Sequence, residues 1–535
     1  MSIFRIKPDS PSLSKPYFLG LCLITIAIIS CKTSPKLAKF SETDRPNIIY
    51  ILADDMGYGE LGAYGQQLIE TPNLDALARS GMRFTQHYTS APVCAPARYM
   101  LLTGSHSGHA FIRGNDEWGD RGEIWSYQKM IMDSTLEGQR PMPSDTKILP
   151  QYLKSMGYAT GMSGKWGLGA PHTASIPTKM GFDYFYGYNC QRQAHTYYPV
   201  HLYENEYRVH LNNDTIPPNL KLPENADPKD PATYANYTLN DYAPTLMYDK
   251  MIDFIDQNKD QPFFFYWATP IPHNPIQAPQ KWVDYYVKKF GSEEPYLGQK
   301  GYFPHQHPHA GYAAMISYLD EQVGALVAYL KANQLYDNTL IMFSSDNGVT
   351  HTGGTDGVYF NSSGPFDEVQ GRGKGFVYEG GIRVPMIASW PRHITEGTTT
   401  DHISVHYDVL ATISDLLGFE LTEQTDGISF LPTLLGKKQN AKHEFLLWEF
   451  PENGGQVAIR IGDWKVVRQH LKDKDAPTLE LYHLIRDPGE KNNLAAQHPE
   501  IIEQASIIFA REHQNAQTER FRIPAIESGL LGSKN

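Results

Sequence analysis

Cysteine is scarce in this sequence. Only four cysteines occur among 535 residues, at positions 22, 31, 94 and 190. So few cysteines without a repeated spacing exclude a disulfide framework. Positive charge is also in deficit, because Asp and Glu outnumber Lys and Arg and leave a net charge of −12. That balance argues against a nucleic-acid-binding face, which requires clustered Lys and Arg. The hydrophobic content of 41% and the charged content of 20% are those of an ordinary globular chain.

The N-terminal segment has the pattern of an export signal. Basic residues precede the apolar run YFLGLCLITIAII, which ends in Ser30 and Cys31. This run is too short for a membrane span and predicts a signal peptide over residues 1–30. The small residue before Cys31 resembles a lipoprotein box, whereas a plain signal peptide and a membrane anchor are the alternatives. We expect a lipid on Cys31, a tether over residues 31–45, and a periplasmic location, with the cell surface as the alternative.

Apolar runs and amphipathic segments alternate along the next part of the chain. Strands are expected at 48–53, 263–268 and 339–348, and helices at 71–81, 94–102 and 313–333, with Thr71 as a helix cap. This alternation predicts an α/β fold with a large mixed, mainly parallel sheet sandwiched by helices. Residues 205–240 lack periodicity and are interpreted as a surface insertion.

The pattern changes after about residue 435. The segments HEFLLWEF, QVAIRIGDWKVVRQ and LELYHL alternate apolar and polar residues, as antiparallel strands with one solvated face do. A helix is expected at 498–513. We therefore predict a main domain over 46–435 and a smaller α+β subdomain with an antiparallel sheet over 436–535.

Polar residues follow several of the predicted strands. Asp54 and Asp55 come after the first strand, and Asp346 and Asn347 come after the strand near residue 340. Their oxygen atoms suit Ca²⁺ or Mg²⁺ better than Zn²⁺. Each pair alone could be a helix cap or a turn. Together they favour a metal site, because adjacent buried carboxylates repel each other unless a cation neutralises them.

The stretch SAPVCAPARYMLLTG places Cys94 at the predicted start of a helix. Pro96 suits the first helical turn, and Gly104 suits the end of the helix. A helix N-terminus stabilises anions, and Arg98 lies one turn further along. Three alternatives remain for the cysteine: an inert buried residue, a low-pKa thiolate nucleophile, or a bridge to Cys190.

The segment Cys94-Ala95-Pro96-Ala97-Arg98 resembles the C-x-P-x-R motif of the formylglycine-dependent sulfatases. RPNIIYILADDMGYGE, GKWGLG, GFDYFYGY, PIPHNP, SSDNG and KGFVYEGGIRVP resemble further motifs of this family, in the family's order. The resemblance covers residues 46–390 and extends to the C-terminal part. It implies an alkaline phosphatase-like fold for the large domain, which would then be catalytic.

The resemblance also implies roles for individual residues. Cys94 would be oxidised by a maturation enzyme to formylglycine, whose hydrated aldehyde is the nucleophile, next to one Ca²⁺ ion, or Mg²⁺ as the alternative. The implied substrate is a sulfated carbohydrate, and the resemblance favours galactose-type sugars. The remaining carried-over roles are metal binding by Asp54, Asp55, Asp346, Asn347 and the modified Cys94, sulfate binding by Arg98, Lys165 and Lys374, and protonation of the leaving alcohol by His273.

One position departs from the family pattern. The family motif commonly reads GKWHLG, and its histidine helps to release the product, whereas this chain has Gly167 there. Either His172 or His195 supplies the missing base, or this chain manages without one. Two further residues are weaker candidates for substrate contacts: Arg372, and His309 in the tract HQHPHAG, which suits a substrate rim or plain surface better than a metal.

Two rival functions stay open at this point. A phosphomonoester or phosphodiester hydrolase of the same superfamily would use a similar pocket, because phosphate and sulfate are both tetrahedral anions. A sulfated-glycan-binding protein would result if Cys94 were never converted.

Overall fold

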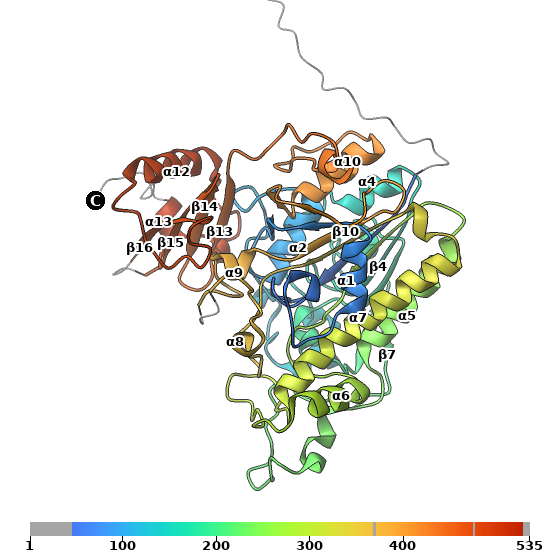
Figure 1. Ribbon diagram of the computed structural model, residues 1–535. Coiled ribbons are helices and arrows are strands. Elements are labelled where there is room, and N and C mark those ends of the chain that lie inside the picture. The colour runs from blue at the N-terminus through green and yellow to red at the C-terminus, as the bar shows by residue number, and fades with distance from the viewer. Residues whose placement is uncertain (1–44, 368–370, 474–476, 528–535) are drawn as a thin grey trace, which may run out of the picture. The chain divides into compact units, whose positions relative to one another are not determined.

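The computed structural model describes residues 45–367, 371–473 and 477–527, and all of these belong to one compact unit (Figure 1). The predicted signal peptide and Cys31 lie outside the described residues, as does the tether up to residue 44. Within the described ranges, no helix is both long and apolar enough to cross a membrane.

A ten-stranded sheet forms the centre of the large domain. Its members are β1 (Asn47–Ala53), β2 (Met82–Phe84), β4 (Ala159–Lys165), β5 (Tyr184–Tyr188), β6 (His201–Glu204), β7 (Tyr207–His210), β8 (Phe263–Ala268), β9 (Thr339–Ser345), β10 (Met386–Ser389) and β11 (Thr398–Thr400). They lie in the order β11-β2-β10-β9-β1-β8-β4-β5-β6-β7. The central strands β9, β1, β8, β4 and β5 are parallel, whereas β10, β6 and β7 pair antiparallel. The predicted mixed, mainly parallel sheet is confirmed.

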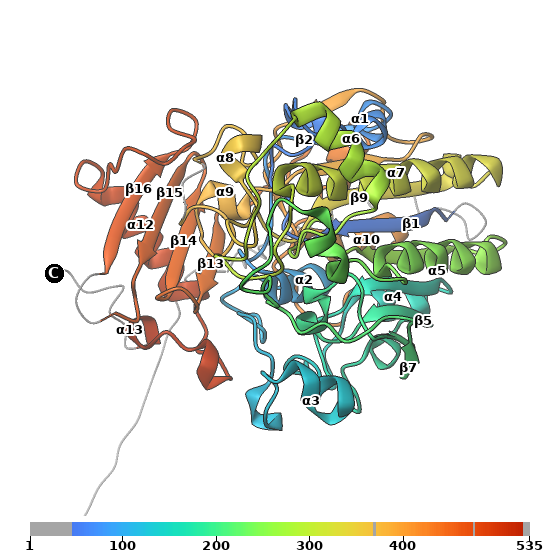
Figure 2. The ribbon, with the colours of Figure 1, turned by 90° about the horizontal axis from the view of Figure 1, so that it is seen from below.

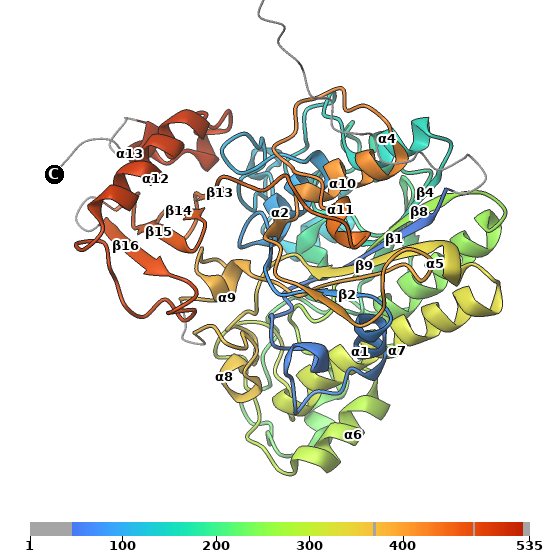
Figure 3. The same cartoon turned by 45° about the horizontal axis from the view of Figure 1, so that its top comes forward.

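Helices cover both faces of this sheet. Figure 3 shows α2 (Cys94–Thr103), α4 (Leu149–Ser155) and α10 (Asp408–Leu417) on one side of β1, with α5 (Ala243–Asn258) and α7 (Pro308–Ala332) on the other. Alternate residues of β1, Ile49 and Ile51, enter the core that α5 and α7 cover. The remaining elements are α1 (Pro72–Arg79), α3 (Tyr127–Met132), α6 (Gln280–Phe290), α8 (Gly357–Phe360), α9 (Glu379–Ile382), α11 (Leu431–Leu434) and the short pair β3 (His87–Tyr88) and β12 (Ser404–Val405).

The start of α1 is capped by a residue distant in sequence. Thr71 is the N-cap residue, as predicted, but its side chain makes no capping bond to α1. Instead, the carboxylate of Asp320 on α7 accepts the backbone N–H groups of Asn73 at 3.1 Å and Leu74 at 2.7 Å. These N–H groups have no partner within a helix. Asp320 therefore joins α1 to α7 as well as capping it.

A second sheet follows in the C-terminal part. β13 (Leu446–Phe450), β14 (Gln456–Ile461), β15 (Trp464–Gln469) and β16 (Thr478–His483) are antiparallel in this order (Figure 2). α12 (Pro499–Glu512) and α13 (Pro524–Glu527) complete this part. The antiparallel sheet is confirmed.

The expectation of one solvated face is wrong for β13 and β14. One face packs with Val377 and Ile382 of the large domain, and the other packs against Phe509 of α12. Charged side chains in this sheet are buried where ion pairs compensate their charges. Lys465, fully buried, lies 3.0 Å from Glu379 and 2.9 Å from Glu490.

Candidate active site

Four neighbouring strands deliver the candidate residues to one edge of the large sheet. The carboxyl ends of parallel strands meet at the same edge, which is where ligands bind in such sheets. Asp54 and Asp55 follow β1, Asp346 and Asn347 follow β9, His273 lies in the loop after β8, and Lys165 ends β4.

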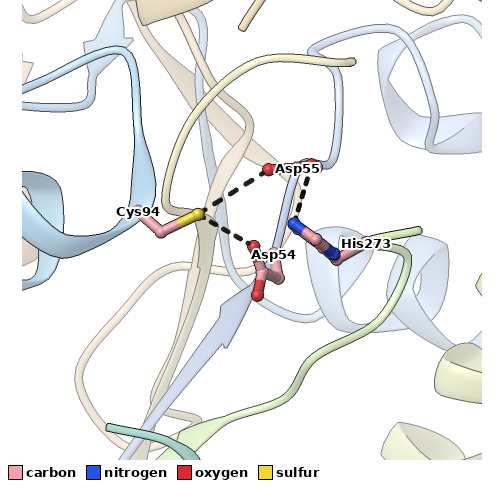
Figure 4. Close-up of side chains that lie close together, drawn as sticks. All are labelled: Asp54, Asp55, Cys94 and His273. Atoms are coloured by element: carbon pink, nitrogen blue, oxygen red, sulfur yellow. Dashed lines mark hydrogen bonds and ion pairs between the residues drawn. The ribbon is translucent and has the colours of Figure 1, made fainter. Parts of the chain in front are cut away.

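Cys94 is the first residue of α2, and the helix ends at Thr103 before Gly104 in a left-handed conformation, as the sequence predicts. Its Sγ lies 3.3 Å from Oδ1 of Asp54 and 4.0 Å from Oδ1 of Asp55 (Figure 4). Burial and the nearby Asp346 raise the pKa of the Cys94 thiol. This is opposite to what a thiolate nucleophile requires. Cys94 and Cys190 are both free and buried, so no bridge joins them.

Three cations surround the carboxylates. Nζ of Lys165 lies 2.7 Å from Oδ2 of Asp54, and Nζ of Lys374 lies 2.7 Å from Oδ1 of Asp55. Arg98, fully buried, donates from Nε and Nη2 to Oδ2 of Asp346 at 3.1 and 2.8 Å. Arg98 and Lys165 are thereby held in place.

The carboxylates of the site differ in their ionisation. Burial alone would raise the pKa of Asp54, but Lys165 and other cations hold it well below its usual range. Burial and the charge of Asp54 raise the pKa of Asp346 to about 6. Burial likewise raises the pKa of Asp55, against the effect of Lys374. Three ionised carboxylates this close repel one another. A bound cation would offset that repulsion.

Asn347 provides a specific test of metal binding. Its Nδ2 donates to Oδ1 of Asp55 at 2.8 Å, while its Oδ1 is buried and has no hydrogen-bond partner among the described residues. An unpaired buried carbonyl oxygen beside carboxylates fits a hard cation. Among the described residues, two groups could hold a metal, and one of them is Asp54, Asp55, Cys94 and His273.

The second such group is His106, His109 and Asp426, outside this site. The two histidine rings stack 4.1 Å apart, and Nδ1 of His109 lies 2.9 Å from Asp426. Nδ1 of His106 accepts the backbone N–H of Gly108 at 3.1 Å, so in the neutral ring the other nitrogen carries the proton. A protonated nitrogen does not bind a metal. We therefore interpret His109 and Asp426 as a hydrogen-bonded pair on which the ring of His106 stacks.

His273 points its Nε2 into the site. Nε2 lies 3.8 Å from Oδ2 of Asp55 (Figure 4). Nδ1 lies 2.6 Å from the carbonyl oxygen of Asn274. That carbonyl can only accept, so Nδ1 carries a proton. Burial, followed by the charges of Lys374 and Lys165, lowers the pKa of His273 well below its usual range. His195 stacks on His273 with ring centres 5.5 Å apart, so it adjoins the site, and its role as a base or substrate contact stays a prediction.

The contacts of the other three candidates lie elsewhere. The exposed His172 bonds to Ser134, and His309 lies between Glu293 and Asp356. Arg372 stacks on Tyr378 at 4.2 Å. Nothing in these contacts brings any of the three to the charged cluster, and their roles stay predictions.

Gly167 lies against Gln191 rather than against free space. Its φ is 70°, and a Cβ at this position would lie 2.8 Å from Cγ of Gln191. Nε2 of Gln191 donates to Oδ1 of Asn115 at 3.3 Å, and the same oxygen accepts the backbone N–H of Ala95 at 3.1 Å. Asn115 is not among the site residues predicted from the sequence, because no local pattern marks a residue twenty positions after Ala95. The volume expected for a histidine is taken up by an amide network that reaches the residue next to Cys94.

Comparison with known proteins agrees with this geometry. Residues 46–419 match the family model described as Sulfatase, and residues 368–514 match N-sulphoglucosamine sulphohydrolase, C-terminal. The chain belongs to the sulfatase family. This sulfatase is 30% identical to human N-acetylgalactosamine-6-sulfatase, with 88% of this chain and 86% of the relative covered. It is 29% identical to N-acetylgalactosamine-6-O-sulfatase of Bacteroides thetaiotaomicron, with 92% and 97% covered.

A solved structure supports the same assignment. The crystal structure of Ps i-CgsB superposes on this sulfatase with a TM-score of 0.69 at 26% identity, covering 92% of this chain and 98% of that one. Phosphonate monoester hydrolase of Agrobacterium radiobacter shares the fold, with a TM-score of 0.60 at 19% identity and 88% and 96% covered. The enzyme is a sulfuric ester hydrolase.

Proposed function

We propose that this sulfatase removes sulfate from sulfated carbohydrate, with galactose-type sugars as its substrates. The observation that carries the proposal is the convergence of Cys94, three cations and His273 at the carboxyl ends of parallel strands. The names of the relatives support the sugar class, because two of them are N-acetylgalactosamine-6-sulfatases. Ps i-CgsB has also been crystallised with k-i-k-neocarrahexaose.

The proposal includes one bound Ca²⁺ ion, with Mg²⁺ as the alternative. Asp54, Asp55, Asp346 and Asn347 would hold it, and the unpartnered Oδ1 of Asn347 supports this assignment. When bound, the ion would neutralise charge on a sulfate oxygen. Removal of the ion by a chelator should abolish turnover, and Ca²⁺ should restore it.

The proposal also includes conversion of Cys94 to formylglycine by a maturation enzyme. When formed, the hydrated aldehyde would supply the attacking hydroxyl group. The chain places this group at the start of α2, with Nζ of Lys374 3.6 Å from the present Sγ. Asp346 forms an ion pair with Arg98. Asp346 is the proposed acceptor for the proton of that hydroxyl group.

The other side chains would bind the sulfate group and protonate the leaving alcohol. Arg98, Lys165 and Lys374 would stabilise charge on the sulfate oxygens, and they are already fixed by carboxylates before substrate arrives. The ring proton of His273 stays on Nδ1, bound to the carbonyl oxygen of Asn274, so Nε2 must first take up a proton from solvent. The negative charge of a bound sulfate ester would favour that uptake, and Nε2 would then pass the proton to the leaving oxygen.

Mass spectrometry and kinetics test the proposal together. The enzyme is coexpressed with a maturation enzyme, and the peptide containing residue 94 is expected to have the mass of the aldehyde. Cys94→Ala should abolish hydrolysis of a sulfated galactose, whereas Cys190→Ala, at the other buried free cysteine, should retain it. An active enzyme with unmodified cysteine at position 94 would overturn the mechanism.

The two rival functions predict other results. A phosphoester hydrolase would have a higher kcat/KM for aryl phosphate than for aryl sulfate. A glycan-binding protein would bind the sulfated sugar without turnover even after conversion of Cys94. We expect aryl sulfate to be preferred and the sugar to be hydrolysed.

We propose further that the enzyme is exported and carries a lipid on Cys31, on the periplasmic side of a membrane. The support is the sequence pattern before Cys31. Globomycin, which blocks lipoprotein signal peptidase, should cause the precursor to accumulate. Cleavage at any bond other than the one before Cys31 would contradict this.

A further inference from the structure

Three aromatic rings from distant segments meet beside the charged cluster. The rings of His195 and His273 stack with centres 5.5 Å apart. Tyr302 stands across both, with its ring centre 5.2 Å from that of His195 at 65° and 5.9 Å from that of His273 at 83°. The catalytic roles proposed above use His273 but leave Tyr302 without a function.

Charges of the active site act on the Tyr302 hydroxyl group. Burial raises the pKa of Tyr302, and Lys374 opposes this while Asp55 and Cys94 add to it. The hydroxyl group is therefore within electrostatic reach of the residues that surround Cys94. The residue is nonetheless only partly buried, so part of it is accessible from solvent.

The backbone of Tyr302 has an unusual conformation. Its φ is 62°, which bulky residues rarely adopt because the side chain crowds the backbone. Such a conformation persists only where surrounding structure holds it, and it is common at ligand sites. Here the backbone N–H of Tyr302 donates to Oδ1 of Asn219 at 2.5 Å. Asn219 thus holds the backbone from which the tyrosine ring projects.

Asn219 belongs to the segment that the sequence predicts as a surface insertion. The insertion binds the loop of Tyr302 at further points. Nζ of Lys221 donates to the carbonyl oxygen of Gly298, and Ile216 and Tyr237 pack with Phe303 in a small core. Most of the insertion is irregular, yet it forms a scaffold for one loop at the active site.

We infer that Tyr302 is a specificity-determining residue whose ring forms a wall for the sugar that carries the sulfate group, and that Asn219 is the positioning residue for this wall. The inference rests on the proposed function. An aromatic face packs well against the C–H groups of a pyranose ring, and a phenol hydroxyl can donate to a sugar oxygen. Inorganic sulfate would contact the cations and not this wall.

Binding measurements separate the wall from the charged cluster. The full chain carrying Cys94→Ala, which cannot turn over, is titrated calorimetrically with galactose 6-sulfate and with inorganic sulfate. Tyr302→Ala should weaken binding of the sugar sulfate about tenfold, in the range that one lost contact in a pocket costs. Binding of inorganic sulfate should stay within about twofold, since its partners are unchanged. Tyr302→Phe should retain most of the affinity for the sugar.

Asn219→Ala should weaken sugar binding in the same way, because the backbone that carries the tyrosine ring loses the hydrogen bond that holds it. The matched control is Asn212→Ala, in an exposed position of the same insertion, which should change neither affinity. Equal weakening of both ligands in Tyr302→Ala would overturn the inference, as would unchanged sugar binding. A wild-type site that binds sulfate but not the sugar sulfate would overturn it too. Turnover of sulfated saccharides by the mature wild-type enzyme is measured in parallel, and its absence would count against the proposed function alone.

Discussion

Adding a side chain at Gly167 should lower the free energy of unfolding of this sulfatase. The expected loss has a backbone part, a steric part and an entropic offset. The left-handed φ of 70° costs an ordinary residue about 1–2 kcal/mol. Displacing Gln191, whose Cγ would lie 2.8 Å from the new Cβ, costs roughly 1–3 kcal/mol. Lower entropy of the unfolded chain offsets about 0.4–1 kcal/mol. For Gly167→Ala we expect a loss of about 1–5 kcal/mol in the free energy of unfolding.

A matched glycine isolates the backbone contribution. Gly157 also has a left-handed φ, 83°, but nothing lies within 4 Å of a Cβ built there. Gly157→Ala should therefore cost only the backbone part less the same entropy offset, about 0–1.6 kcal/mol. Equilibrium denaturation of both variants, of Gln191→Ala, and of Gly167→Ala combined with Gln191→Ala gives the steric part as a coupling energy.

The outcome of this experiment decides between two explanations. Equal losses in Gly157→Ala and Gly167→Ala would refute the steric overlap with Gln191, and a Gly167→Ala variant as stable as the wild type would refute the whole argument. Gly167→His, which restores the residue common in the family, should lower turnover rather than raise it. The reason is that moving Gln191 breaks its bond to Asn115, which also holds Ala95 beside Cys94.

Three further predictions concern contacts away from the chemistry. Asp320→Ala should cost about 1–2 kcal/mol in unfolding free energy by uncapping α1, and Asp320→Asn should cost less; equal losses would contradict capping. The hydrogen bond to Asp426 raises the pKa of His109, so this stabilisation is full below about pH 6.5 and is lost as pH rises through the raised pKa. The thermal stability of His109→Gln should lack this dependence on pH. A dependence of stability on pH equal to that of the wild type would refute the role given to the bond between His109 and Asp426. Lys465→Met should cost about 3–5 kcal/mol because it leaves Glu490 buried without its cation, and a denaturation midpoint equal to that of the wild type would disprove this.

The strands and their polar ends could be predicted from the sequence because both signals are local. The apolar run at 263–268 coincides with β8, and the helix at Cys94 begins and ends as expected. The motif residues converge because parallel strands end at one edge. Their individual roles remain predictions, since proximity alone does not assign them.

Contacts that depend on distant residues could not be predicted. Asp320 caps α1 across 247 positions, and Asn219 holds Tyr302 across 83. The sheet in the C-terminal part has the period-two pattern of a solvated face, but buried ion pairs such as that of Lys465 with Glu379 replace solvent. A side-chain pattern records polarity, and it does not record which polar partner lies opposite.

The ion pairs of the active site have a consequence for ligand affinity. Three carboxylates, of Asp54, Asp55 and Asp346, face three cations, of Arg98, Lys165 and Lys374. When all three carboxylates are ionised, these charges cancel. A neutral cluster has little intrinsic preference for an anion. A divalent cation would leave two positive charges in excess, which matches the dianionic sulfate product. Affinities for metal and for sulfate are then linked reciprocally, each ligand raising the affinity of the other by the same factor.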